Sequence, residues 1–149
     1  MANSSAICTS FKVDLFNGVH AFGTTVTRGG TGADTFKAAL YQTTATTGAA
    51  TTAYSATNEV SSSNYSAGGV AVTNGNAPTS SGTTAYWTPS ASFAWSTVTF
   101  TTDCCLLYNS TQSNRAIASY TFGSQMVTAG NFTLTMPTND STHALIQLI

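Results

Sequence analysis

The sequence predicts an all-β protein: an antiparallel sandwich of two sheets, jelly-roll-like or immunoglobulin-like, with about eight short strands. Short runs rich in Val, Thr and aromatic residues recur along the chain, and clusters of Gly, Asn, Ser and Pro separate them. The chain has 149 residues and is 42% hydrophobic, enough for one domain with a real core. The predicted strands do not alternate with helices, so a parallel sheet is not expected.

The chain is expected to divide into a short N-terminal part and the sandwich. Residues 1–22 are predicted to form an arm with a short helical or turn segment, and residues 23–149 to form the β-sandwich domain. Residues 1–10 are small and polar, as expected for an arm.

A short helical segment or turn is predicted over residues 11–16. Ser10 is its candidate N-cap, and Asn17-Gly18 predicts a turn that ends it. The residues that fit one helix face are Phe11, Leu15, Val19 and Phe22.

Residues 34–41, DTFKAALY, form the first clear strand. Their alternation is typical of a half-buried strand, because successive side chains point to opposite faces. Before them, residues 24–27 are expected to be extended and residues 28–33 to form a loop.

The low-complexity tract 43–54 follows this strand. Like the arm at residues 1–10, it contains few large apolar groups. Burial therefore offsets little of the chain entropy lost on ordering. We expect both segments to become ordered only against a partner.

The remaining strands are predicted where β-favourable residues lie between turn signals. The apolar run at 104–108 predicts a strand buried on both faces, and a loop is expected at 109–114. The other predicted strands are 70–73, 83–88, 93–95, 98–100, 116–122, 131–136 and 144–149.

Alternation and β propensity also predict which side chains form the core. They are Phe36, Leu40, Trp95, Val98, Phe100, Leu106, Tyr108, Ile117, Tyr120, Phe132, Leu134 and Ile146.

The charge content argues against several classes of partner. Only 6% of the residues are charged, with four basic and five acidic residues and a net charge of −1. Phosphate neutralisation requires clustered Lys and Arg, so nucleic-acid binding is not expected. No apolar run of about 18 residues predicts a transmembrane helix, and the N-terminal residues do not resemble a secretory signal.

The three cysteines predict packing rather than chemistry. Cys104 and Cys105 are adjacent, so in a strand they point to opposite faces and should not bond each other. Neither they nor Cys8 belong to a CxxC motif or lie near a histidine in sequence, which argues against a zinc site. We expect buried, reduced thiols.

The sequence offers no catalytic, cofactor-binding or metal-binding residue set. His20 and His143 are isolated, and hydrogen-bonded structural roles are expected for both. No nucleophile elbow or phosphate-binding loop is present. No acidic pair lies close in sequence among Asp14, Asp34, Glu59, Asp103 and Asp140. The chain is therefore not expected to be an enzyme.

Aromatic residues leave one alternative open. A cluster of them near the middle of the chain could form a sugar-binding platform, but they alternate as core residues do, and core is the preferred interpretation. They are Tyr86, Trp87, Phe93, Trp95 and Phe100.

Several segments together resemble a family of small structural proteins encoded by tailed bacteriophages. The segments are FKVDLFNGVHAF, DTFKAALY, TTAYSATNEVSSSNYSAGGVAV, FAWSTVTFTTDCCLLYN, AIASYTFG and GNFTLTMP. The resemblance runs from about Phe11 to Ile149. The Cys104-Cys105 pair departs from it, since a less unusual strand start is expected there.

The resemblance implies a virion protein with no catalytic residues. The expected role is capsid decoration, or cement: binding to the major capsid protein lattice as a homotrimer on the capsid surface, after synthesis in the cytoplasm of the host bacterium. The alternative is a carbohydrate- or receptor-binding module of a head or tail fibre. That alternative predicts exposed aromatic side chains, for instance Tyr65, Tyr86 or Trp87.

Overall fold

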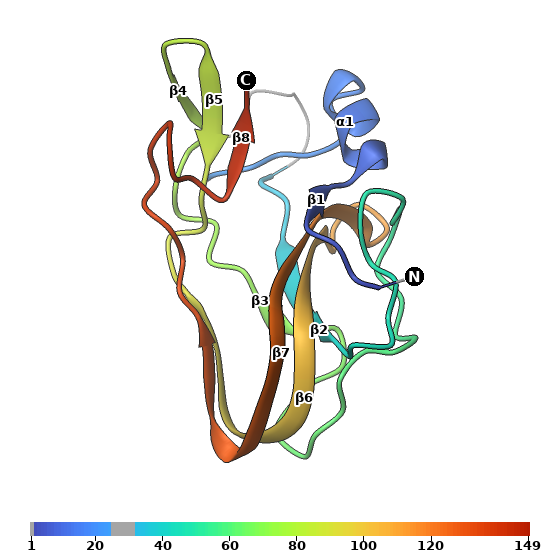
Figure 1. Ribbon diagram of the computed structural model, residues 1–149. Helices are drawn as coiled ribbons and strands as arrows, with labels where there is room; N and C mark the ends of the chain where they lie inside the picture. The colour runs from blue at the N-terminus through green and yellow to red at the C-terminus, as the bar shows by residue number, and fades with distance from the viewer. Residues whose placement is uncertain (1, 25–31) are drawn as a thin grey trace.

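Residues 2–24 and 32–149 are described in the computed structural model, and they form two antiparallel sheets and one short helix (Figure 1). The five-stranded sheet has the order β1-β7-β6-β2-β3, and the three-stranded sheet has the order β4-β5-β8. This confirms the predicted all-β sandwich with a short N-terminal helix. The strands are β1 (Ala6–Ile7), β2 (Phe36–Tyr41), β3 (Val70–Ala71), β4 (Thr79–Ser81), β5 (Thr84–Trp87), β6 (Phe93–Asn109), β7 (Arg115–Leu134) and β8 (Ile146–Leu148).

The helix α1 (Thr9–Phe16) confirms the helical segment predicted at 11–16, although it begins earlier. Its N-cap residue is Cys8, which makes no side-chain cap bond, and not the expected Ser10. The hydroxyl of Ser10 instead donates to the carbonyl oxygen of Thr51 at 3.4 Å. The extended piece and loop expected at 24–33 fall mostly on residues that lie outside the described part of the chain.

Strand β2 lies inside the larger sheet, between β6 and β3. The half-buried pattern expected for it is wrong, because both of its faces are covered. Ala38, Ala39 and Leu40 are each completely buried. Two successive alanines leave room for neighbouring layers to approach from both sides, which a strict apolar–polar alternation would not predict.

Strands β6 and β7 form one long hairpin, where the sequence predicted separate short strands. The polar residues between the predicted pieces continue the pairing, as in Thr101 with Met126 and Thr102 with Gln125. Register shifts occur on β6 between Trp95 and Val98 and between Val98 and Phe100. Such irregularities bend a strand and increase its local twist.

The hairpin folds back on itself at its lower end in Figure 1. Phe122 and Phe132 both belong to β7, and ten residues of extended strand span roughly 33 Å. Their ring centroids are nevertheless only 5.7 Å apart. Positive φ angles at Gly123 (76°) and Ala129 (46°) mark the bend. We call residues 93–98 of β6 with 130–134 of β7 the outer ribbon.

Aromatic side chains fill the space between the outer ribbon and the rest of the hairpin. Trp95 and Phe132 from the outer ribbon lie 5.9 Å apart between centroids, and Phe100 lies 5.7 Å from Phe132. Tyr65 closes the group, 6.1 Å from Phe100. The folded hairpin thus supplies two layers of the core from two consecutive strands.

The predicted core is largely confirmed. Nine of the twelve expected side chains are buried, and the other three, Tyr120, Phe132 and Leu134, are partly buried and pack against the core. The apolar run of β6 is buried on both faces, as predicted.

The expectation that residues 1–10 and 43–54 require a partner is wrong, because the two segments bind each other and the sheet. The main-chain N–H of Ser4 donates to the carbonyl of Thr47 at 2.9 Å, and Asn3 Oδ1 accepts from Thr47 N at 2.9 Å. On the other side, Ala116 N donates to Thr52 O at 3.0 Å. Main-chain bonds and close packing of small side chains replace the large apolar groups that these segments lack.

Candidate functional site

The structure gathers several titratable side chains at the end of the molecule where the β6–β7 turn meets α1. Asp14 on the helix binds Arg115 through a 2.7 Å contact, and its other oxygen lies 3.4 Å from His20 Nε2. Asn109 Nδ2 lies 2.9 Å from His20 Nδ1 and donates to Asp34 Oδ2 at 2.8 Å. This cluster was not predicted from the sequence, because Asp14 is 101 positions from Arg115 and His20 is 89 positions from Asn109.

The geometry gives His20 a structural role. The amide nitrogen of Asn109 carries only protons, so Nδ1 of His20 accepts and the imidazole proton lies on Nε2, facing Asp14. The side chain of His20 is completely buried. An imidazole bound to an amide and closed off from solvent has neither a nucleophile to activate nor access to substrate. The predicted hydrogen-bonded role for His20 is confirmed.

His20 is expected to make stability depend on pH. Burial lowers its pKa below the ordinary 6.5, which outweighs the opposite effect of Asp14. The unfolded chain therefore binds a proton more readily than the folded chain, and this contribution to stability is present above pH 6.5 and lost as the pH falls below it.

The prediction is checked by urea unfolding at about pH 7.5 and 5.5. His20→Gln should reduce the loss of unfolding free energy on acidification, while the exposed control His143→Gln should retain it. An identical loss in His20→Gln and the unmutated protein would contradict the assignment.

A second buried carboxylate, Glu59, holds the loop that follows β2. Its oxygens accept hydrogen bonds from the hydroxyls of Tyr54 and Tyr65, both at 2.7 Å, and from Gly68 N at 2.8 Å. Burial raises the pKa of both phenols, and the Glu59 carboxylate raises it further. The tyrosines thus remain protonated donors, and three neutral donors satisfy the carboxylate without a salt bridge to it within the described residues.

Asp140 and His143 form an exposed pair near the C-terminal strand. Asp140 Oδ1 lies 2.9 Å from His143 Nδ1 and accepts main-chain N–H bonds from Thr142 and His143. These bonds, those from Thr142 foremost, lower the pKa of Asp140 below its ordinary range. This is a turn-capping arrangement, and it confirms the hydrogen-bonded role predicted for His143.

The three thiols are buried and free, as predicted. Burial raises the pKa of Cys8 to about 11, and it also raises the pKa of Cys105. Cys104 Sγ lies 3.0 Å from Thr47 Oγ1 and 3.1 Å from Ser119 Oγ. Protonated thiols in such surroundings are poor nucleophiles. Within residues 2–24 and 32–149, no group of three His, Cys, Asp or Glu side chains is arranged to hold a metal ion.

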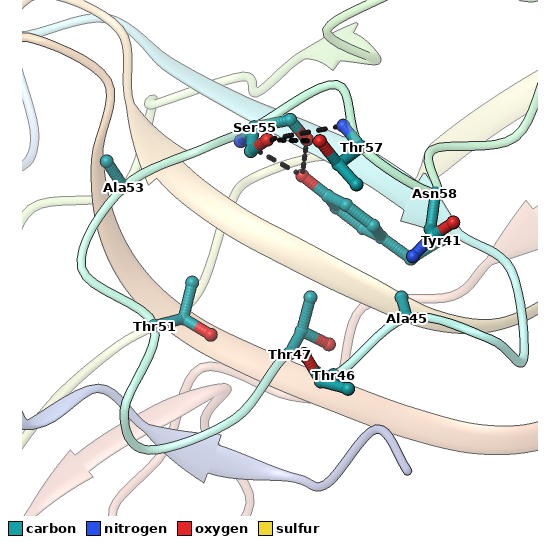
Figure 2. Close-up of a pocket in the computed structure, with 9 residues that line it drawn as sticks. All are labelled: Tyr41, Ala45, Thr46, Thr47, Thr51, Ala53, Ser55, Thr57 and Asn58. Atoms are coloured by element: carbon teal, nitrogen blue, oxygen red, sulfur yellow. Dashed lines mark hydrogen bonds between the residues drawn. The ribbon is translucent and has the colours of Figure 1, made fainter. Parts of the chain in front are cut away.

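One pocket lies between the end of β2 and the tract 43–54, with a volume of about 220 Å³. Figure 2 shows that its lining consists of hydroxyls, one amide and small apolar groups, with the Tyr41 hydroxyl turned towards Ser55. The Tyr41 hydroxyl donates to the carbonyl oxygen of Ser55. The lining residues are Tyr41, Ala45, Thr46, Thr47, Thr51, Ala53, Ser55, Thr57 and Asn58. A lining without charge can offer neutral hydrogen bonds and no acid–base pair.

Four of the five aromatic residues considered for a sugar platform belong to the core, as preferred from the sequence. Trp87, Phe93, Trp95 and Phe100 are all at least nine-tenths buried, and Tyr86 is partly buried. Tyr65, the other candidate, is buried with its hydroxyl on Glu59. A stacking platform for a sugar ring requires exposed ring faces, which the five buried residues do not present.

The most distinctive surface belongs to two long stretches of the chain that contain no charged residue. Residues 60–102 and 116–139 contain no Asp, Glu, Lys, Arg or His. These two stretches include the whole outer ribbon, whose exposed side chains are small and neutral: Ala94, Ser96, Thr97, Asn131 and Thr133. Nearby on β7, the side chain of Met126 is 81% exposed. The outer ribbon and the neighbouring bend of β7 thus offer neutral hydrogen-bonding groups and an apolar side chain.

A second apolar surface lies where α1 faces the smaller sheet. A groove of about 120 Å³ there is lined by residues that include Phe11, Phe22, Trp87 and Ile146. Phe16, at the end of the helix, is 94% exposed. No helix among the described residues is long and apolar enough to span a bilayer.

Comparison with known proteins finds no matching family model, no matching curated protein and no matching solved structure.

Proposed function

We propose that this protein is a structural component of a tailed-bacteriophage virion: a capsid decoration, or cement, protein that binds and stabilises the major capsid protein lattice. The proposal starts from the resemblance carried by DTFKAALY, TTAYSATNEVSSSNYSAGGVAV and the later segments. It places the protein on the capsid surface as a homotrimer.

The positions of the resembling residues support the proposal. Asp34 accepts hydrogen bonds from Ala21 N at 2.7 Å and from Asn109 at 2.8 Å, and Glu59 holds Tyr54 and Tyr65. The segments that carry the resemblance thus supply the buried polar contacts that fix the fold. A likeness in such residues is expected to reflect a shared architecture, with partner contacts made by the surface.

The burial of the aromatic residues is the observation that favours this role over glycan or receptor binding. The alternative depends on exposed Tyr or Trp rings, and Tyr65 and Trp87 are 8% and 3% exposed. A neutral surface rich in Thr, Ser and Asn suits broad contact with a protein lattice through apolar burial and hydrogen bonds.

The decisive test is the location of the protein in the virion of the phage that encodes it. Cryo-electron microscopy should place it on the outside of the capsid shell, and the purified protein should sediment with empty capsids. A glycan array serves as the discriminating control. Virions that lack the protein would overturn the proposal, and glycan binding without capsid binding would favour the fibre alternative.

Attachment to the capsid is expected to survive high salt. With 6% charged residues, the contacts depend little on exposed ion pairs. Screening weakens such pairs and leaves apolar burial intact. In about 1 M sodium chloride the screening length is roughly 3 Å. Virions washed in this salt should therefore retain the protein, and mass spectrometry measures its amount relative to the major capsid protein. Complete release in salt would contradict this expectation.

A further inference from the structure

The outer ribbon is a pair of strands with two unpaired edges. Phe93 pairs with Leu134 and Trp95 with Phe132, so the two strands satisfy each other on their inner sides. β2 pairs with β6 only from residue 104 onward, and β1 pairs with β7 only at residues 118 and 119. In the described part of the chain, no main-chain hydrogen bond from another element reaches residues 93–96 or 130–134.

The unpaired segment of β6 has a defined end. Asn64 Nδ2 donates to Thr97 O at 2.8 Å, and Thr99 N donates to Ser62 Oγ at 3.0 Å. Side chains of the segment between β2 and β3 thus cap β6 where its unpaired segment ends. The open segment, Phe93 to Ser96, lies beside the open segment of β7.

These edges lack charged side chains and prolines, two of the features that protect exposed strand edges in monomeric proteins. Natural edges are blocked by charged side chains, prolines or coverage, because unpaired N–H and C=O groups recruit other strands. Residues 90–102 and 116–136 contain neither a charged residue nor a proline. The exposed side chains beside the edges, Ala94, Ser96 and Thr133, are small enough to let a neighbouring strand approach. The edges are therefore suited to pairing with another strand.

We infer that the β7 edge of the outer ribbon pairs with the β6 edge of the outer ribbon in the next copy of this chain, and that this contact closes the homotrimer. The inference rests on the trimer of the proposed function. Since β6 and β7 are antiparallel, placing β7 of one copy beside β6 of the next continues the antiparallel order. A contact between two different edges repeats around a ring, whereas a contact of β7 with its own copy gives a two-fold dimer and leaves β6 unpaired.

A second copy fits the charge pattern of these edges better than a charged partner does. Neither strand of the outer ribbon carries a charge, so identical copies approach without repulsion and without an unpaired ion at the contact. The nearest charged residues along the chain are Glu59, Asp103, Arg115 and Asp140, all outside the outer ribbon.

The test uses two single-cysteine variants on separate chains. Ala94 and Thr133 face each other within one copy, so both cysteines on one chain would react internally. Ala94→Cys and Thr133→Cys are therefore expressed alone and together with different tags, then treated with a short bis-maleimide reagent. The unmutated protein is the control, since its own thiols are at most 1% exposed.

The expected result is a covalent dimer of the two tagged chains when they are co-expressed, and none in either variant alone. Efficient crosslinking of Thr133→Cys alone indicates two-fold β7 pairing and overturns the inference. Two other results also overturn the inference. One is a protein that is trimeric in native mass spectrometry while the two co-expressed variants do not crosslink. The other is a protein that is monomeric at every concentration.

A charge at the edge gives an independent readout. Thr133→Lys is expected to convert the trimer to monomer in native mass spectrometry, with its far-ultraviolet circular dichroism spectrum unchanged. The matched control Thr44→Lys, an exposed threonine of the tract 43–54, should remain trimeric. A trimeric Thr133→Lys overturns the inference. These assays need no virion, so their failure is distinct from failure to find the protein on the capsid.

Discussion

Replacement of Gly69 by alanine is expected to destabilise the protein by at least about 3 kcal/mol, enough to unfold many domains of this size. Gly69 has a φ of +74°, which L side chains rarely adopt. A Cβ atom at this position would also overlap the main-chain carbonyl of Ala38, in the middle of β2. The chain can relieve this overlap only by separating β3 from β2, which breaks the edge of the larger sheet.

Gly82→Ala is the matched control for Gly69→Ala. Gly82 also has a positive φ, +57°, but nothing lies within 4 Å of a Cβ atom built there. Its substitution should cost only the backbone strain, about 1 kcal/mol. Chemical denaturation of both variants measures the difference. Equal losses of unfolding free energy would show that the contact with Ala38 is not what requires glycine at position 69.

The second large effect is expected for Leu106→Ala, with a loss of roughly 2–5 kcal/mol. Leu106 is completely buried in β6, opposite Ala39 of β2 and Ser119 of β7. These small neighbours belong to strands fixed by hydrogen bonds on both sides, so the cavity left by the mutation cannot easily collapse. The full transfer and cavity costs are therefore expected.

Leu148→Ala is the control for Leu106→Ala, because Leu148 is 38% exposed at the edge of the smaller sheet. It should cost less than about 1 kcal/mol. Phe132→Ala, in the outer ribbon, tests the folded-back hairpin separately. Losses below about 0.5 kcal/mol at both Leu106 and Phe132 would contradict the packing of the two layers, since surface substitutions have effects of that size.

The fold class was predictable because strand propensity and turn residues act locally. The apolar run of β6 was found from its uninterrupted apolar residues, and the core positions Phe36 and Leu40 from alternation and β propensity. The single hairpin was not, because the polar residues Thr101 and Thr102 interrupt the hydrophobic pattern while their main chains continue the pairing. Strands β1 and β4 were missed because they are short and carry almost no large apolar group.

The polar clusters were beyond prediction for a different reason. Asp14 of α1 contacts Arg115 at the start of β7, 101 positions away, and His20 contacts Asn109 at the end of β6, 89 positions away. Nothing in the local sequence indicates either contact. The order of the tract 43–54 was likewise missed, because it depends on main-chain hydrogen bonds that composition does not reveal. The absence of charged residues at 60–102 and 116–139, in contrast, is visible in the sequence. It suggests pairing with another strand only once the structure shows which strands have open edges.

The pairing of β1 with β7 also bears on how the chain acquires its structure during synthesis. Ala6 pairs with Ser119 and Asn3 bonds to Asp103, so these residues leave the ribosome well before their partners, which follow at least 100 positions later in the chain. Contacts between residues so distant in sequence slow the search for the native state. The β6–β7 hairpin is local and can form first, and β1 cannot pair with the larger sheet until β7 exists. The larger sheet is therefore expected to be completed only after β7 has been synthesised.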